Sequence, residues 1–325
     1  MTRIRWGILG NAKIARDFVI PAIRLSRNGE VVALASRDRS KAAEVCNRFT
    51  IPVLHDDYAG LLASPDIDAV YIPLPNTLHV EWTQRAIAAG KHVLCEKPLA
   101  MHAQEIDGLI EARDRSALTV GEAFMVAHHP QWEYARRTIA EGRIGPLRMV
   151  ECAFAYRNLD AGNIRNRRDL GGGALRDIGV YPVVTTRIVT GKEPIRAQAS
   201  IEWDAAFRTD KLAVCLVSFE DFHLSFYCAT QMARLQQMTF HGDAGWLRLE
   251  APFNAGVYDQ ARVTLRLNDG SGTEDTIFPQ ANQYQNMVEN FADAVQGKAP
   301  LVFPLESSRA NQRVIDMLFA AGKGP

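Results

Sequence analysis

The segment GILGNAKIA, residues 7–15, has the residue types of a loop that binds the phosphates of a dinucleotide. In such a loop the first glycine makes a tight turn between a strand and a helix, and the third position of the pattern lets the helix pack closely on the strand. Gly10 and Ala15 fit these two roles, whereas Ala12 stands where a second glycine would let the backbone approach the pyrophosphate most closely. An ordinary strand–turn–helix unit is the alternative. The helix-start N–H groups remain available for an anion, so the sequence predicts cofactor binding at Gly10, Asn11, Ala12, Lys13 and Ile14.

The end of the next strand indicates which dinucleotide fits. The segment ALASRDRSK, residues 33–41, places Ser36 and Arg37 where NAD-binding folds carry an acidic residue for the ribose 2′-hydroxyl. A hydroxyl group and a planar guanidinium suit a 2′-phosphate instead, with Lys41 close by. We therefore expect NADP(H) as the preferred cofactor. NAD(H) remains possible if Asp38 serves the ribose and Arg37 stacks on adenine or faces solvent.

The composition narrows the classes of partner. The chain has 325 residues, of which 47% are hydrophobic, enough to form a sizeable core. The 37 basic residues balance the 37 acidic ones, so the net charge predicts neither nucleic acid nor a membrane surface as a partner. No apolar run approaches the roughly 20 residues of a spanning helix, and the N-terminus lacks a signal-peptide pattern. Five widely spaced cysteines are typical of reduced thiols, so we expect a cytoplasmic protein. No metal site is predicted, since His128 and His129 have no partner cluster.

Two patterns of secondary structure divide the chain. In the first part, apolar strand-like segments alternate with helical ones, at 31–35, 69–72, 92–95 and 119–123. This alternation predicts an α/β domain at residues 1–123 with a Rossmann-type parallel sheet. Later strand-like segments follow one another across turns, at 147–156, 212–219, 222–228, 236–240, 246–249 and 263–267, with helices near 131–141, 284–295 and 306–320. They predict a C-terminal α+β domain at residues 124–325, built on a large, mostly antiparallel sheet.

Three separated motifs occur in one order along the chain: GILGNAKIA, then YIPLPNTLHVEWTQRAIAAGKHVLCEKPLA at 71–100, then GGGALRDIGVYPV at 171–183. Together they resemble the Gfo/Idh/MocA oxidoreductase family, in the branch with NADP-dependent xylose dehydrogenase, dimeric dihydrodiol dehydrogenase and glucose-fructose oxidoreductase. The resemblance runs from residue 4 to about 318. It implies an NADP(H)-dependent oxidoreductase that transfers hydride between nicotinamide and a carbinol or carbonyl carbon of a sugar or related polyol. It also implies a homodimer, or a higher homo-oligomer, paired through the C-terminal sheet.

The resemblance assigns catalysis to Lys97, Asp177 and Tyr181. Lys97 follows an apolar strand in the motif EKP, where a cation can hold a substrate oxygen and lower the pKa of a neighbouring acid. Pro98 can lock this backbone, through a cis bond as in family members. Asp177 and Tyr181 are four residues apart, which places them on one face of a helix. Tyr181 is expected to transfer the hydroxyl proton, Lys97 to stabilise the oxyanion, and Asp177 to orient substrate hydroxyls or the lysine.

The resemblance implies further contacts with cofactor and substrate. Beside Lys97, the cofactor is expected to meet Pro73, Asn76, His79 and Glu96, and the substrate to meet Arg165 and Tyr284. A helix-start asparagine, a surface histidine and a helix cap near 284 would account for several of these. The arginines around 165 are usually a solvated face, but in a substrate cleft they could hold a phosphate, so a nucleotide-linked sugar stays open. The glycines at 171–173 are expected to let substrate or cofactor approach the backbone.

Two other functions fit the same motifs. A glycosidase-like lyase would use a tightly held NAD for transient oxidation and would show no net NADP turnover. A non-catalytic NADP-binding sensor would bind the cofactor alone, although the joint presence of Lys97, Asp177 and Tyr181 argues against it. The sequence does not name the sugar, because loops assemble the pocket.

Overall fold

The structure, a computed structural model, describes residues 3–257 and 260–322 and consists of two compact units. The first unit contains the residues up to 128 together with residues 282–309. The second contains residues 129–281 and the residues from 310 onward. The expected division placed the boundary after residue 123, whereas the first unit extends to residue 128 and also contains residues 282–309.

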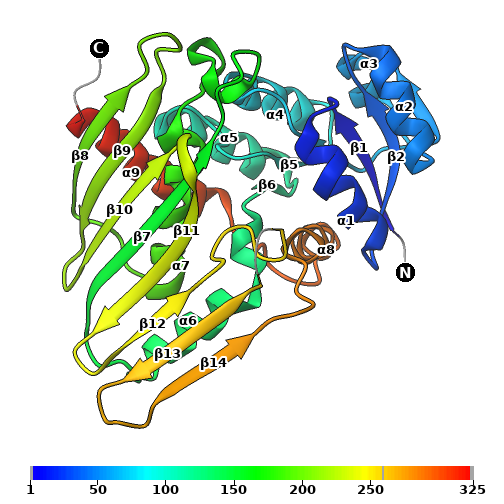
Figure 1. The fold of residues 1–325 in the computed structure, drawn as a ribbon. Coiled ribbons are helices and arrows are strands. Elements are labelled where there is room, and N and C mark those ends of the chain that lie inside the picture. The colour runs from blue at the N-terminus through cyan, green and yellow to red at the C-terminus, as the bar shows by residue number, and fades with distance from the viewer. Residues whose placement is uncertain (1–2, 258–259, 323–325) are drawn as a thin grey trace. The chain divides into compact units, whose positions relative to one another are not determined.

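The first unit is built on a six-stranded sheet in the order β3-β2-β1-β4-β5-β6, with every pair parallel. Its strands are β1 Ile4–Leu9, β2 Gly29–Ala35, β3 Val53–His55, β4 Ala69–Ile72, β5 His92–Cys95 and β6 Val120–Glu122. Its helices are α1 Ile20–Leu25, α2 Arg39–Phe49, α3 Tyr58–Ala63, α4 His79–Ala88, α5 Ala103–Ser116 and α8 Gln283–Val295 (Figure 1). In β1 only Arg5 is not buried, because helices cover both faces of a parallel sheet. The carboxyl ends of these strands therefore meet at one edge.

Helix α8 joins the first unit through apolar and charged contacts. The ring of Phe291 packs 5.1 Å from that of Trp6 on β1. Arg27, in the loop after α1, forms an ion pair with Glu289, and Asn28 donates a hydrogen bond to the Glu289 carbonyl at 2.9 Å. This amphipathic helix thus belongs to a unit whose sheet is formed by residues that precede it by about 150 or more positions in the chain.

The second unit is built on an eight-stranded sheet in the order β14-β13-β12-β11-β7-β10-β9-β8. The strands are β7 Leu147–Arg157, β8 Arg196–Trp203, β9 Asp210–Ser218, β10 His223–Ala229, β11 Gln231–Gly242, β12 Gly245–Leu249, β13 Arg262–Leu267 and β14 Thr273–Ile277. All neighbours are antiparallel except β7 and β10. The sheet has one buried face, since Ala213, Cys215 and Val217 on β9 are buried while Val214 and Leu216 are exposed.

Helices cover the buried face of this sheet. They are α6 Pro130–Ala140, α7 Val180–Thr190 and the end of α9 Leu305–Ala321, which begins in the first unit (Figure 1). A π-helical turn, Leu175–Gly179, leads directly into α7. A Cβ at Gly179 would lie 3.1 Å from the sulfur of Cys228 on β10, so the glycine lets the helix approach the sheet closely.

The predicted fold class is confirmed: a Rossmann-type parallel sheet and a large, mostly antiparallel sheet. The sequence analysis missed β3, β8 and β14. All three are edge strands, and none of them contains a buried residue. Edge strands carry a weak hydrophobic pattern because one side faces solvent and charged residues protect the edge.

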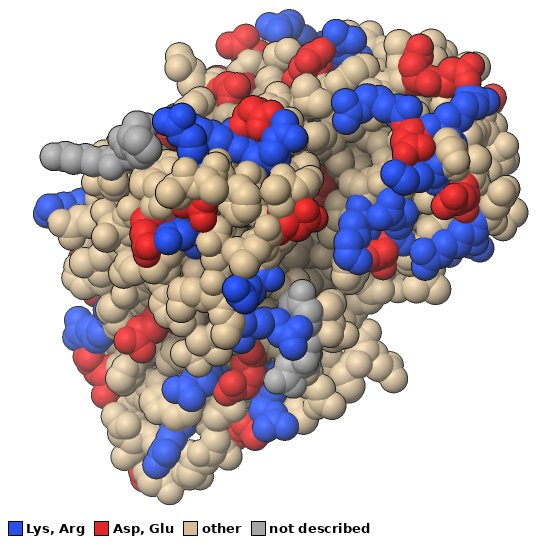
Figure 2. Space-filling model, turned by 45° about the horizontal axis from the view of Figure 1, so that its top comes forward, with Lys and Arg blue, Asp and Glu red and all other residues tan. Residues whose placement is uncertain are grey.

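Charged side chains of both signs are interspersed on the face of the molecule drawn in Figure 2. Within the described parts of the chain, no helix combines the length and the apolar character needed to cross a membrane.

Candidate active site

The glycine loop leaves β1 in a conformation that requires glycine. Gly10 has φ +114°, and a Cβ on it would lie 3.1 Å from the Leu74 side chain. Its N–H donates to the carbonyl of Ala35 at 2.7 Å, which ties the loop to the end of β2. Arg16 donates to the backbone and side-chain oxygens of Asn11 at 2.9 and 3.1 Å. Ala12 and Ile14 are half-buried and Lys13 is exposed, so the loop presents its backbone at the edge where the parallel strands end.

A π-helical turn, Ala15–Val19, follows this loop. The described residues contain one other such turn, the one that carries Asp177. Turns of this kind are rare in helices and are frequent at functional sites. Both therefore fall in segments that the sequence analysis predicted to be functional.

At the end of β2, the acidic residue is already engaged. The Asp38 carboxylate accepts the Lys41 N–H at 3.1 Å and pairs with the Lys41 ammonium at 3.0 Å, so it caps α2. The hydrogen bond from the Lys41 backbone is the main cause that holds the pKa of Asp38 below its ordinary value. Arg37 is exposed and lies near Tyr58: burial raises the pKa of Tyr58, and the Arg37 charge opposes this rise. The Tyr58 hydroxyl lies 3.7 Å from the Cβ position of Gly10. Ser36 is buried beside them. The Asp38 carboxylate is thus engaged by Lys41, whereas the Arg37 guanidinium is exposed.

The loop after β5 carries Lys97 between a buried carboxylate and a proline. Glu96 accepts a hydrogen bond from the Tyr71 hydroxyl at 2.6 Å and from the Lys97 N–H at 3.2 Å. Burial raises the pKa of Tyr71 well above its ordinary value, so its hydroxyl stays protonated and donates. The Lys97–Pro98 peptide bond is cis, as the resemblance implied.

His79 links two loops at this edge of the sheet. It is fully buried rather than at the surface, and its ring nitrogens lie 2.7 Å from the Leu74 carbonyl oxygen and 2.8 Å from that of Pro98. Burial lowers its pKa, and the contacts of the ring with the two carbonyl oxygens oppose this shift. His79 was predicted to contact the cofactor. None of it is exposed in the structure, where it lies between the loop after β4 and the Lys97 loop.

Glu122 is a functional candidate that the sequence analysis missed. It ends β6, is buried, and accepts the Leu99 N–H at 2.8 Å. Burial raises its pKa to about 7. The signal was an acidic residue inside the apolar run TVGEAF, at the carboxyl end of a parallel strand, where such sheets place their ligands. Together with Glu96 and His79, it holds the backbone on both sides of Lys97.

In the second unit, Asp177 lies in a small hydrogen-bonded cluster. One of its oxygens accepts from the Tyr156 hydroxyl at 2.6 Å and from the Arg165 guanidinium at 2.8 Å. The Asp177 charge raises the pKa of Arg165, and burial with the same charge raises that of Tyr156. The structure therefore joins the predicted pair Arg165 and Asp177, and it adds Tyr156 on β7, which the sequence analysis missed because strand aromatics are usually core residues.

Tyr181 stands one turn further along, in α7, with 5% of its surface exposed. Its ring packs against Phe154 at 5.6 Å and Phe253 at 5.3 Å. The electrostatic field of Tyr181 also reaches Arg165 and contributes to the raised pKa of that guanidinium. Two aromatic neighbours thus restrict the ring of the predicted proton-transfer residue.

Family models match both units of this chain. The model described as an oxidoreductase family with an NAD-binding Rossmann fold matches residues 4–124, and the GFO/IDH/MocA C-terminal domain matches residues 132–248. D-xylose 1-dehydrogenase (NADP(+)) 2 from Haloferax volcanii is 34% identical over 98% of this chain and 97% of its own. This chain belongs to the GFO/IDH/MocA oxidoreductase family.

Other members are similar to this oxidoreductase. A dTDP-3,4-didehydro-2,6-dideoxy-alpha-D-glucose 3-reductase from Streptomyces violaceoruber is 34% identical over 90% of this chain and 85% of its own. The solved structure of a 3-ketoreductase from Actinomadura kijaniata in complex with NADP and TDP-benzene matches with a TM-score of 0.91 and 31% identity, covering 98% of both chains.

The glycines before the Asp177 helix serve the oxidoreductase's own packing. A Cβ at Gly172 would lie 2.4 Å from the Arg165 carbonyl oxygen, and one at Gly173 would lie 1.8 Å from the Asp210 carboxylate. Asp210 is buried, accepts the Leu175 N–H at 2.6 Å, and has its pKa raised by burial to about 7. The expectation that the glycines admit substrate or cofactor is therefore corrected for Gly172 and Gly173, where another segment of the protein occupies that space.

Three remaining candidates of the oxidoreductase lie in the first unit. Tyr284 is the second residue of α8, is 8% exposed, and stacks on Phe18 at 4.9 Å. Asn282 caps the helix, because its side-chain oxygen accepts the Tyr284 N–H at 3.1 Å. Pro73 is buried in the loop after β4, and Asn76 starts the short turn Asn76–Leu78 that precedes His79. Within residues 3–257 and 260–322, no group of three His, Cys, Asp or Glu side chains could hold a metal ion.

Proposed function

We propose that this oxidoreductase transfers hydride between NADP(H) and the carbinol or carbonyl carbon of a sugar or related polyol. The observation that carries the proposal is the lysine loop at the carboxyl ends of the parallel strands. There Glu96, Glu122 and His79 hold the backbone around one lysine. Such a cation suits a substrate oxygen that gains negative charge. Two similar oxidoreductases are a D-xylose dehydrogenase and a reductase of a dTDP-linked sugar.

The glycine loop and the end of β2 fit NADP(H). Gly10 has a positive φ, and the loop residues that follow it are exposed or half-buried, which suits a pyrophosphate. Gly10, Asn11, Ala12, Lys13 and Ile14 would hold this group. Ser36, Arg37 and Lys41 would hold the 2′-phosphate, since Asp38 caps α2 instead of facing a ribose. Pro73, Asn76 and Glu96 border the nicotinamide side. When bound, the cofactor supplies or accepts the hydride.

Lys97 and Tyr181 form the proton-transfer pair in this proposal. A phenol has an ordinary pKa near 10, so it needs a cation to accept a proton at neutral pH. During oxidation Tyr181 takes the hydroxyl proton and Lys97 stabilises the oxyanion, and during reduction Tyr181 returns the proton. Asp177, with its charge compensated by Arg165 and Tyr156, orients substrate hydroxyls.

The related ketoreductase supports this pair. Solved forms of it replace one lysine with alanine or glutamate, or one tyrosine with phenylalanine. In its chain these two residues are separated by the same number of positions as Lys97 and Tyr181. Over 98% of both chains, equal spacing favours equivalent positions.

Nicotinamide absorbance with both cofactors tests the function. Aldoses, dihydrodiols, keto-sugars and nucleotide-linked keto-sugars are assayed in both directions. We expect turnover of at least one sugar with NADP(H). Elimination products without net NADP turnover would instead indicate the lyase, and tight NADP binding without turnover of any substrate would indicate the sensor.

We also propose a homodimer, or a higher homo-oligomer, that pairs through the open face of the eight-stranded sheet in the cytoplasm. Exposed apolar side chains on that sheet support the pairing: Val214 and Leu216 on β9, and Met232 and Leu235 on β11. All five cysteines are free and buried, as in proteins of reducing compartments. Sedimentation equilibrium of Leu216→Glu against the natural sequence tests the pairing, and an unchanged mass would contradict it.

A further inference from the structure

Phe253, in the loop between β12 and β13, is the centre of an aromatic cluster in the second unit. Its ring is fully buried, and its centroid lies 4.7 Å from that of Phe154 on β7 and 6.3 Å from that of Trp132 on α6. The same centroid lies 5.3 Å from that of Tyr181, which also packs against Phe154 at 5.6 Å. Rings at these separations attract one another, so the position of Phe253 helps to set the position of the Tyr181 ring.

The loop that carries Phe253 has no regular secondary structure around this residue. Such loops are usually more mobile than the strands they connect, but two glutamine side chains hold this one. The amide nitrogen of Gln131 donates to the carbonyls of the two residues before Phe253, at 3.3 and 3.1 Å. The amide oxygen of Gln236 accepts the N–H groups of Phe253 and of the next residue, at 3.2 and 3.1 Å. Residues 251–254 are thus held through two carbonyls and two N–H groups in succession.

The two glutamines come from different elements. Gln131 is the second residue of α6 and is fully buried. Gln236 lies on β11 opposite Phe154 of β7, and its alternation with the buried Met238 places it on the covered face of the sheet. The other end of each amide has no hydrogen-bond partner among the residues that the structure describes. The hydrogen bonds to the loop are therefore what orients both amides.

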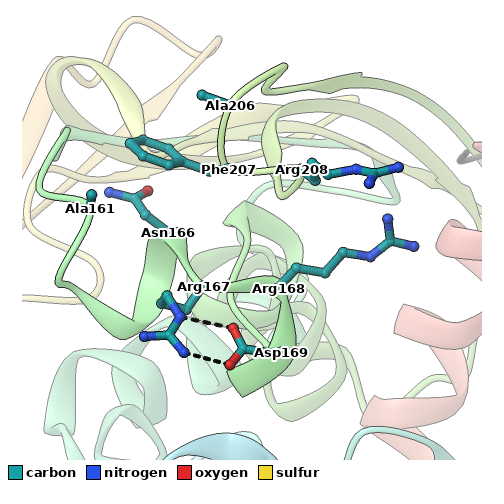
Figure 3. Close-up of a pocket in the computed structure, with 8 residues that line it drawn as sticks. All are labelled: Ala161, Asn166, Arg167, Arg168, Asp169, Ala206, Phe207 and Arg208. Atoms are coloured by element: carbon teal, nitrogen blue, oxygen red, sulfur yellow. Dashed lines mark hydrogen bonds and ion pairs between the residues drawn. The ribbon is translucent and has the colours of Figure 1, made fainter.

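A second turn of this unit allows a comparison. The Asp204 carboxylate accepts the N–H groups of Ala206 and Phe207 at 2.8 and 2.7 Å, in the turn between β8 and β9. Figure 3 shows Phe207 beside a hollow of about 640 Å³ that exposed arginines border. In the described part of the chain, no aromatic ring packs on it. Phe253 differs, because side chains hold its loop from both sides and its ring contacts three others.

We propose that Gln131 and Gln236 are positioning residues for Tyr181, which they hold in place through Phe253. Removal of either amide lets the loop and Phe253 shift, and the Tyr181 ring then moves with them. The inference rests on the proposed function, in which the Tyr181 hydroxyl exchanges a proton with the substrate. A displacement of about 1 Å can cost a reaction about 100-fold, so the two amides should affect turnover more than substrate binding.

Steady-state kinetics of three methionine variants test the positioning. Methionine is unbranched and has the same number of rotatable bonds as glutamine, but it has no amide. Gln131→Met and Gln236→Met should each lower kcat by about ten-fold and change KM by less than about two-fold. Gln84→Met is the matched control, an exposed glutamine on α4 in the first unit, and its kcat should stay unchanged. Normal kcat in both Gln131→Met and Gln236→Met would overturn the proposal.

One isosteric exchange should act in opposite ways at the two positions. Gln236→Glu keeps an oxygen that accepts both N–H groups, so its kcat should return to within about three-fold of the natural value. Gln131→Glu brings a carboxylate oxygen against two carbonyl oxygens, so its kcat should fall at least as far as in Gln131→Met. Equal kcat in the two glutamate variants would contradict the assigned hydrogen bonds. If melting shows that Gln131→Glu does not fold, the comparison of Gln236→Glu with Gln236→Met decides.

A double variant shows whether the amides act through Tyr181. In the Tyr181→Phe background, Gln236→Met should change the residual kcat by less than about two-fold, because the hydroxyl that it positions is gone. A ten-fold loss in that background would overturn the proposal, since the amide would then act by another route.

A measurement without substrate separates this inference from the proposed function. Fluorotyrosine is incorporated at position 181 alone, and its fluorine NMR signal is recorded in the full chain. Gln131→Met and Gln236→Met should shift or broaden the signal, whereas Gln84→Met should leave it unchanged. An unchanged signal in all three variants would overturn the positioning, and turnover of a sugar by the natural sequence would still support the function. A changed signal without turnover of any sugar would support the positioning and contradict the proposed function.

Discussion

The imidazole Nδ1 of His79 lies 2.8 Å from the carbonyl oxygen of Pro98, the residue that follows Lys97. Its other nitrogen lies 2.7 Å from the carbonyl of Leu74, whose side chain would meet a Cβ on Gly10. One buried ring therefore connects the lysine loop with the loop beside the glycine turn. This places His79 where it can affect both chemistry and cofactor binding without touching either reacting group.

Two substitutions at His79 should separate these effects. Asparagine places its amide near the Nδ1 position and keeps the contact with Pro98, whereas glutamine reaches the Nε2 position and keeps the contact with Leu74. We expect His79→Gln to lower kcat by about 10- to 100-fold with little change in the cofactor Kd. His79→Asn should mainly weaken the cofactor. Steady-state kinetics and NADP+ titration check this, and equal changes in both parameters for both variants would contradict it.

Glu122 should make stability depend on pH. Burial raises its pKa from 4.5 to about 7, so the folded protein binds this proton more tightly than the unfolded chain does. The stabilisation is complete below about pH 4.5 and is lost as pH rises to about 7, a change of up to about 3 kcal/mol. Glu122→Gln stays neutral and can still accept the Leu99 N–H.

The measurement is urea unfolding of Glu122→Gln and the natural sequence from pH 5 to 8. We expect the variant to lose less stability across this range. The control is Glu111→Gln, an exposed glutamate on α5, which should leave the slope unchanged. Parallel curves for Glu122→Gln and the natural sequence would show that another group, such as Asp210, carries the slope.

Lys97 and Tyr181 should act as one catalytic unit. Lys97→Met keeps the apolar stem and removes the cation, so turnover should fall by about 100-fold or more with little change in NADP binding. Tyr181→Phe removes only the hydroxyl and should cost about 100- to 10,000-fold. The double variant should be scarcely worse than the weaker single variant. Near-normal turnover in both single variants would refute the proposed mechanism.

Arg37 should discriminate between the two cofactors. Arg37→Ala should weaken NADP binding by about ten-fold or more and leave NAD binding nearly unchanged, because only NADP has the 2′-phosphate. Its neighbour Arg39, which pairs with Asp56, is the matched control. Fluorescence titration with both cofactors measures the effect. Equal losses for both would contradict the assignment.

Gly173 should be among the positions least tolerant of a side chain. It has φ +122°, and an added methyl would lie 1.8 Å from the Asp210 carboxylate. Gly191, at the end of α7, also has positive φ, at +67°, but has no atom within 4 Å of its Cβ position. Gly191→Ala should cost about 1 kcal/mol, whereas Gly173→Ala should cost at least about 3 kcal/mol. Unfolding free energies compare the two, and equal losses would mean that Asp210 moves aside.

The arrangement of the second half of the chain depended on long-range packing. The local sequence of helix α8 is that of an ordinary amphipathic helix, so its position in the first unit could not be predicted from that sequence. That place depends on Phe291 fitting beside Trp6 and on Glu289 meeting Arg27 and Asn28. The edge strands β3, β8 and β14 escaped detection because half-exposed strands have little hydrophobic pattern.

Local patterns determined the nucleotide-binding turn and the parallel arrangement of the first sheet, because turn geometry and strand periodicity act over a few neighbouring positions. The candidates Lys97, Asp177 and Tyr181 came from the resemblance of the motifs that contain them to a known family. Tertiary structure alone decided that His79 is buried, that Glu122 supports Leu99 and that Asp210 fills the space beside Gly173. Pro98 lies 19 residues from His79, Leu99 lies 23 residues from Glu122, and Asp210 lies 37 residues from Gly173. Only the folded chain brings residues at such separations into contact.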